Sequence, residues 1–227
     1  MNILEHGYLS ARRFGGSHED YLPIHQFLDS TKLYFHHMKH RVVLHNTFGV
    51  ELAVELFGTE LINSHGRGIC VRDIAIAHIK EDLDGHIPTL YDWLGKAFYL
   101  KPYCPEIPEF DSDELKELVV RPYLRSGLKY AMFITLSDFG VSLAEQLLGT
   151  DQAVQLRQKL SPKNRLSQPL SQFEFRHRWQ YTPNGEDLDW LKENGFESGE
   201  SKVGFATSKF PDPANSSESG RSGSGGG

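Results

Sequence analysis

The stretch from Ser30 to Gly58, STKLYFHHMKHRVVLHNTFGVELAVELFG, decides the fold that the sequence predicts. Ser30 is a favourable N-cap residue, no proline interrupts the stretch, and the glycine at its end suits a helix C-terminus. Apolar residues recur at steps of three and four, as on one face of an amphipathic helix. Gly49 lowers helix propensity by roughly 1 kcal/mol, so we expect it to allow a close helix crossing. The pattern predicts one helix over 30–58, which would be roughly 40 Å long.

The same stretch carries four of the eleven histidines of the chain, His36, His37, His40 and His45. On a helical wheel, His36 and His45 lie about 180° apart, so the four side chains cannot bind one metal ion together. Two interpretations stay open. Either these histidines are solvated or are core residues satisfied by hydrogen bonds, or two of them combine with side chains of other helices in a polar site.

The composition is that of an ordinary globular protein with a net negative charge. The 227 residues suffice for one large core or two small ones, and 39% of them are hydrophobic. The formal net charge of -6 argues against general nucleic-acid binding, because that class of protein needs a basic face. The two cysteines form no CxxC motif, so we expect no disulfide framework and a cytoplasmic location. The longest apolar run, residues 131–136, is too short to span a membrane, and the start of the chain lacks the pattern of a signal peptide.

An internal repeat relates two parts of the chain. FGVELAVELFGTE at residues 48–60 matches FGVSLAEQLLGTD at residues 139–151 in eight of thirteen positions, at a constant shift of 91 residues. This repeat predicts a second long helix over 124–149 and two related halves. Chance convergence on helix-ending residues is the alternative. The shared interior glycines, Gly49 and Gly140, favour duplication because helix capping does not require them.

The histidines of the first repeat are missing from the second. At the same shift, His40 and His45 fall opposite Ala131 and Leu136. If the two halves share a fold, that fold does not need imidazole at these places. A buried polar side chain costs free energy unless it has a partner, so these two histidines are candidates for a function.

The whole pattern predicts a mainly α-helical, bundle-like protein in two regions with a tail. The proline-rich segment KPYCPEIPEF reads as a stiff linker. We therefore expect a His-rich helical domain over 1–101 and a second helical region over 102–196 that partly repeats the first. Extended character and a turn motif over 59–72 predict a small hairpin or short strands. The segment 197–227 is rich in Ser, Gly and Pro, which predicts a disordered tail.

Two His–Asp pairs with a spacing of four point to a metal site, because each pair shares one helix face. Neutral imidazoles and a carboxylate can hold a first-row metal and leave a position for water, which then ionises near neutral pH. The expected metal ligands are His40, His45, His78 and Asp82, with His25 and Asp29 behind them. We expect zinc, manganese or iron. No nucleotide cofactor is expected, because the sequence lacks the glycine-rich phosphate loops GxGxxG and GxxxxGK[ST].

Two arginines complete the candidate site. Arg41 and Arg67 are suited to clamp an anionic substrate through paired hydrogen bonds. The alternative for Arg41 is an ion pair with Asp82 between two helices. The alternative for His25 and Asp29 is a solvated helix face.

Several motifs of the first half resemble a known family. They are SARRFGG at 10–16, EDYLPIH at 19–25, Asp29 with Lys32, His40-Arg41 with His45, NSHGR at 63–67, VRDI at 71–74 and HIKEDLDGHIPTLYDWL at 78–94. Over residues 10–94 the chain resembles a family of small bacterial and phage proteins known as a domain of unknown function, DUF6915. The resemblance implies no particular activity.

A second resemblance is to the HD-domain phosphohydrolases, which place one histidine on an early helix and a His-Asp pair on a later one. His45, His78 and Asp82 echo that order, followed by GHIP at 85–88. Ile79 stands where the family has its metal-binding aspartate, so the bridging carboxylate would be missing.

Two functions compete. The first is a helical accessory protein that binds an unknown protein or small-molecule partner, with a structural cluster of His and Asp residues. The second is a metal-assisted hydrolase that acts on a phosphate-bearing small molecule. The missing catalytic motif favours the first, and in either case we expect neither general nucleic-acid binding nor membrane association.

Overall fold

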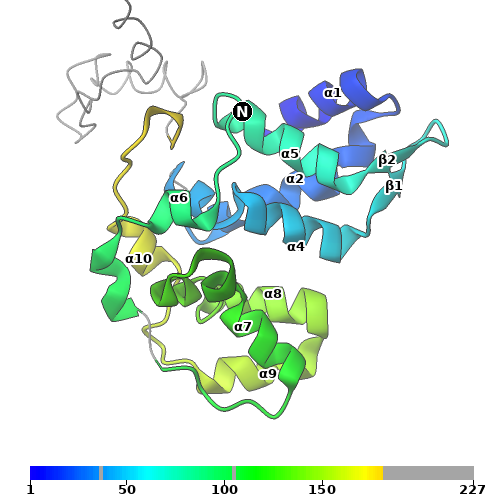
Figure 1. Cartoon of the computed structure of the whole chain (residues 1–227). Coiled ribbons are helices and arrows are strands. Elements are labelled where there is room, and N and C mark those ends of the chain that lie inside the picture. Colours follow the sequence, from blue (N-terminus) through cyan, green and yellow to red (C-terminus); the bar gives the residue numbers. More distant parts are fainter. Residues whose placement is uncertain (36–37, 104–105, 181–227) are drawn as a thin grey trace, which may run out of the picture.

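The structure, a computed structural model, describes residues 1–35, 38–103 and 106–180. The N-terminal half contains α1 (Ile3–Phe14), α2 (Leu22–Asp29), α3 (Arg41–Leu44), α4 (Thr47–Phe57), β1 (Glu60–Ile62), β2 (Gly68–Cys70), α5 (Val71–Asp82) and α6 (Leu90–Leu94). The C-terminal half contains α7 (Asp113–Ser126), α8 (Asp138–Leu148), α9 (Thr150–Lys159) and α10 (Ser167–Ser171). Short 3-10 helices occupy His18–Tyr21, Ser30–Leu33, Met38–His40, Phe98–Tyr103, Lys129–Phe133 and Arg178–Gln180. The described chain is mainly α-helical, as predicted (Figure 1).

The predicted hairpin is confirmed. Strands β1 and β2 pair antiparallel, with Leu61 opposite Ile69. The Oδ1 atom of Asn63 organises the turn by accepting the backbone N–H groups of His65 at 3.1 Å and Arg67 at 3.0 Å. Beyond β2 the chain enters α5 directly (Figure 1).

The prediction of one continuous helix over 30–58 is wrong. The chain turns at His45, and Asn46 starts a new helix because its side chain accepts the N–H groups of Phe48 and Gly49. A Cβ atom on Gly49 would lie 1.9 Å from the carbonyl oxygen of Leu44. The glycine therefore allows a tight corner rather than a crossing of two helices. His36 and His37 lie outside the described residues.

The second long helix, predicted over 124–149, is also divided. Helix α7 continues through Pro122 and ends at Gly127, whose φ of 70° is left-handed. Ser137 then caps α8 as Asn46 caps α4. The corner is the same too, because a Cβ atom on Gly140 would lie 1.8 Å from the carbonyl oxygen of Thr135. In both halves, a capping residue inside an apolar pattern begins a new helix.

The helices gather in two groups. Helices α1, α2, α4 and α5 lie together beside the hairpin, and α7, α8 and α9 form the second group (Figure 1). Ion pairs from α7 to α4 connect the groups, Arg121 with Glu55 and Arg125 with Glu51. The buried apolar residues of both groups form one continuous core.

The predicted tail over 197–227 lies outside the described residues. Cys104, in the linker, does so as well. Over the described ranges, every helix is too short or too polar to cross a membrane.

Candidate metal centre

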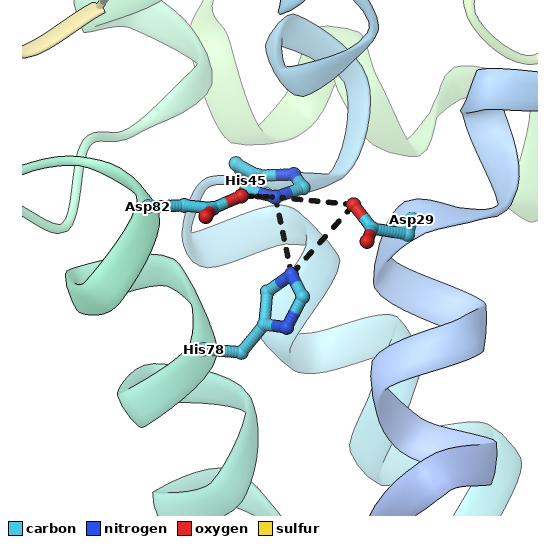
Figure 2. Close-up of side chains that lie close together, drawn as sticks. All are labelled: Asp29, His45, His78 and Asp82. Atoms are coloured by element: carbon cyan, nitrogen blue, oxygen red, sulfur yellow. Dashed lines mark hydrogen bonds and ion pairs between the residues drawn. The ribbon is translucent and has the colours of Figure 1, made fainter. Parts of the chain in front are cut away.

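Four side chains converge in the core of the N-terminal half: Asp29, His45, His78 and Asp82 (Figure 2). Asp29 ends α2, His45 lies at the corner between α3 and α4, and the other two lie one turn apart on α5. Each of the four is between 0% and 2% exposed. One ligand atom from each lies within 4.8 Å of the other three. Two carboxylates and two imidazoles thus meet away from solvent.

The corner of the chain aims His45 at this point. Its φ of -85° and ψ of 64° are those of an inverse γ-turn, closed by the N–H of Asn46, which donates to the carbonyl oxygen of Leu44 at 2.9 Å. Trp93 of α6 donates its indole N–H to the carbonyl oxygen of His45 at 3.0 Å. The γ-turn and the hydrogen bond from Trp93 together fix the backbone at His45, and this sets the direction of its side chain.

The distances between the four ligand atoms suit a small cation. The Nε2 atom of His45 lies 3.1 Å from Oδ2 of Asp82 and 3.1 Å from Nε2 of His78. Oδ1 of Asp29 lies 3.7 Å from the first of these nitrogens and 3.9 Å from the second. In a tetrahedral zinc site with bonds of about 2.0–2.1 Å, neighbouring ligand atoms are roughly 3.4 Å apart.

Asp29 presents an unsatisfied oxygen to the centre of the group. Its Oδ2 accepts a hydrogen bond from Nζ of Lys32 at 2.7 Å. Its Oδ1 is buried and has no hydrogen-bond partner among the described residues. A buried acceptor without a partner costs about 1–3 kcal/mol. A cation between this oxygen and the imidazoles would remove that cost.

Asp82 is ionised and paired. Nη2 of Arg41 lies 2.9 Å from its Oδ2, and Nε2 of His6 lies 3.3 Å from its Oδ1. Burial alone would raise the pKa of Asp82, but the hydrogen bonds with His45 and His6 and the charge of Arg41 hold it well below its usual range. Arg41 thus forms the ion pair that the sequence left open as an alternative to anion binding.

The imidazoles are neutral at neutral pH. Burial is the main cause that lowers the pKa of His40, His45 and His78, and neighbouring histidines lower those of His40 and His78 further. At His45, burial outweighs the opposing effect of Asp82. Neutral imidazole is the form that donates an electron pair to a metal.

A hydrogen-bonded chain lies behind His78. Its Nδ1 lies 3.1 Å from Nδ1 of His25, whose Nε2 lies 3.0 Å from the hydroxyl oxygen of Ser10. When Nδ1 of His78 donates to Nδ1 of His25, and Nε2 of His25 donates to the hydroxyl of Ser10, Nε2 of His78 carries no proton. Its electron pair is then free for a metal at the centre. Burial, followed by the charge of His6, lowers the pKa of His25 to about 3, so this histidine stays neutral. His25 lies behind His78, whereas Asp29, which was expected beside His25, lies among the four central residues.

His40 lies at the edge of the group. Its Nε2 is 3.9 Å from Oδ1 of Asp29. The hydroxyl of Thr31 donates to the carbonyl oxygen of His40 at 3.1 Å, so it can only accept from Nδ1 of the same histidine. The electron pair of His40 is therefore on Nε2, toward Asp29. His40 is a possible fifth ligand outside the group of four.

Arg67 is not brought to the centre. It is exposed in the turn before β2, and β2 leads into the start of α5, whereas Asp82 is the last residue of that helix. Twelve helical residues span roughly 18 Å. The hairpin lies at the end of α5 that follows β2, away from the last turn of the helix (Figure 1).

Sequence reasoning missed His6, which is fully buried in α1. Its Nδ1 lies 2.7 Å from Oε2 of Glu81. Burial works against its charged form, but hydrogen bonds to Asp82 and Glu81 and their charges raise the pKa of His6 above its usual value. The spacing of four between His6 and Ser10 was the available signal, since it places both on one helix face.

The comparisons with known proteins agree with the resemblance over the N-terminal half. Residues 1–103 match the model of a family described as a domain of unknown function (DUF6915). All four central residues lie within this match. Neither a curated protein nor a solved structure matches the chain. The resemblance to HD-domain phosphohydrolases is not supported by these comparisons and stays a hypothesis.

Proposed function

We propose that the protein is a helical accessory protein whose N-terminal half holds one divalent first-row metal ion through Asp29, His45, His78 and Asp82. The observation that carries the proposal is the buried Oδ1 of Asp29, which faces imidazole nitrogens at 3.7–3.9 Å and has no hydrogen-bond partner in the described part of the chain. Zinc, manganese and iron all accept this mixture of nitrogen and oxygen ligands.

The ion would act as a structural link. The four ligands come from the end of α2, the α3–α4 corner and α5, so one ion would tie three separate segments together (Figure 2). A catalytic metal keeps one position open to water and substrate, whereas a structural site is closed by four protein ligands. The near-complete burial of all four residues favours the closed type over a phosphate hydrolase.

The partner-binding part of the proposal has no surface assigned to it. Leu33 is 88% exposed, Leu124 66% and Phe98 60%, but they lie on three different helices, and single exposed apolar side chains do not mark an interaction site. The cytoplasm stays the expected compartment because the chain has only two cysteines.

The test is the metal content of the full chain without a histidine tag. We expect elemental analysis to find about one equivalent of metal, in the purified protein or after EDTA treatment and reloading with zinc, manganese or ferrous iron. Asp29→Asn and His78→Ala should lose it. His18→Ala is the matched control, because His18 pairs with Glu19 away from the centre and should keep the metal.

Metal at 100 times its dissociation constant should stabilise the folded protein by about 2.7 kcal/mol. A failure of every metal to bind or to raise the melting temperature would refute the proposal. Hydrolysis of bis-p-nitrophenyl phosphate by the loaded protein, abolished by Asp29→Asn, would favour the hydrolase instead.

A further inference from the structure

A cavity of about 400 Å³ lies in the second helical region, between the segment before α8 and the segment that leads into α10. Phe133 and Leu136 form a buried apolar floor, and Pro169 adds to it. Lys163 and Arg165 lie at the rim and are exposed. The volume falls within the usual range of small-molecule sites, about 300–1,000 Å³.

Leu136, which lines the cavity, corresponds to His45 of the candidate metal centre. The shift of 91 residues that aligns α4 with α8 relates the two positions. Among the described residues that line the cavity, none is His, Cys, Asp or Glu, so the cavity is suited to an apolar group and not to a metal.

The rim carries the positive charges of Lys163 and Arg165. Asp138 lies nearby, since its Oδ1 accepts the backbone N–H of Leu166 at 2.9 Å. A tight turn holds the two basic residues, since the N–H of Asn164 donates to the carbonyl oxygen of Ser161 and that of Arg165 to the carbonyl oxygen of Lys163, both at 2.9 Å. Neither Lys163 nor Arg165 forms an ion pair with any residue that the structure describes. The residues known to line the cavity include no Asp or Glu. The rim is therefore locally positive in a protein of net charge -6, which favours an anion there.

We propose that the cavity binds a small organic anion with an apolar body. The anionic head, a carboxylate or a phosphate, would pair with Lys163 and Arg165, since the guanidinium fork matches both groups. The apolar body would lie on Phe133 and Leu136. This site is separate from the metal centre, and its occupation does not depend on a metal.

The test uses the full chain and the dye 1-anilinonaphthalene-8-sulfonate, which combines an aromatic body with an anionic head. We expect its fluorescence to report binding that the double variant Lys163→Glu/Arg165→Glu weakens at least tenfold. The matched control is Arg72→Glu/Lys116→Glu, which changes the net charge equally at an exposed arginine and an exposed lysine that do not line the cavity, and it should change affinity less than twofold. An equal loss in both double variants would overturn the proposal.

Two further measurements separate the site from general stickiness. Gln168→Trp adds bulk among the lining residues at an exposed position, so it should block the dye while the melting temperature stays unchanged. Octanoate and phenyl phosphate should compete with the dye, and the stronger competitor identifies the preferred head group. Equal competition by neutral octanol, or none by either anion, would overturn the proposal.

Discussion

Gly49→Ala tests the corner that aims His45 at the metal centre. In a continuous exposed helix this change would stabilise the protein by up to about 1 kcal/mol, because alanine has the higher helix propensity. At the observed corner the new Cβ atom would lie 1.9 Å from the carbonyl oxygen of Leu44, although contacts below 3.0 Å essentially never occur. The backbone must therefore move by about 1 Å, at a cost of roughly 1–3 kcal/mol for overpacking. Losing the Asn46 cap would add about 1 kcal/mol.

We therefore expect Gly49→Ala to destabilise the protein by about 2–4 kcal/mol in urea unfolding and to weaken metal binding. Gly140→Ala is the matched control, because its Cβ atom would meet the carbonyl oxygen of Thr135 at 1.8 Å in the half without the metal centre. It should lower stability by a similar amount and leave the metal content unchanged. A Gly49→Ala variant that is more stable than the natural chain would refute the corner and restore the continuous helix.

Three other outcomes are expected. Trp93→Phe removes the hydrogen bond to the carbonyl oxygen of His45. In a metal titration this variant should bind metal about tenfold more weakly while it stays folded. Unchanged affinity would show that the bond does not position His45. Replacing His40 by Ala and His45 by Leu, as in the second half, should abolish metal binding but leave the apoprotein folded by circular dichroism, and unfolding would assign the pair to structure. Stability should fall as the pH falls below about 6.5. Burial lowers the pKa of His25 to about 3 and lowers the pKa values of His40, His45 and His78 below their usual value. The unfolded chain therefore binds more protons than the folded protein below that pH. Each such group contributes up to about 1.4 kcal/mol per pH unit, and the raised pKa of His6 opposes this effect. A flat profile in urea unfolding between pH 7.5 and 5 would contradict the neutral cluster.

The sequence alone determined the features that depend on neighbours within one helical turn or one hairpin. The helical class, the hairpin near Asn63 and the shared faces of His25 with Asp29 and of His78 with Asp82 all follow from local spacing. The caps Asn46 and Ser137 were not predicted, because the apolar periodicity that runs across them is typical of continuous helices. The glycines of the two corners, Gly49 and Gly140, are also related by the constant shift of 91 residues.

Only the tertiary structure decided which of these faces meet. Asp29, which was expected behind the metal ligands, lies at the centre because α2 ends beside the α3–α4 corner. Arg41 pairs with Asp82 because α3 packs near the end of α5. His6 joined them from the first helix of the chain, 76 residues from Asp82 in sequence. Such contacts depend on how helices pack through their apolar faces, and the spacing of polar residues along one helix carries no information about the helix that it will face.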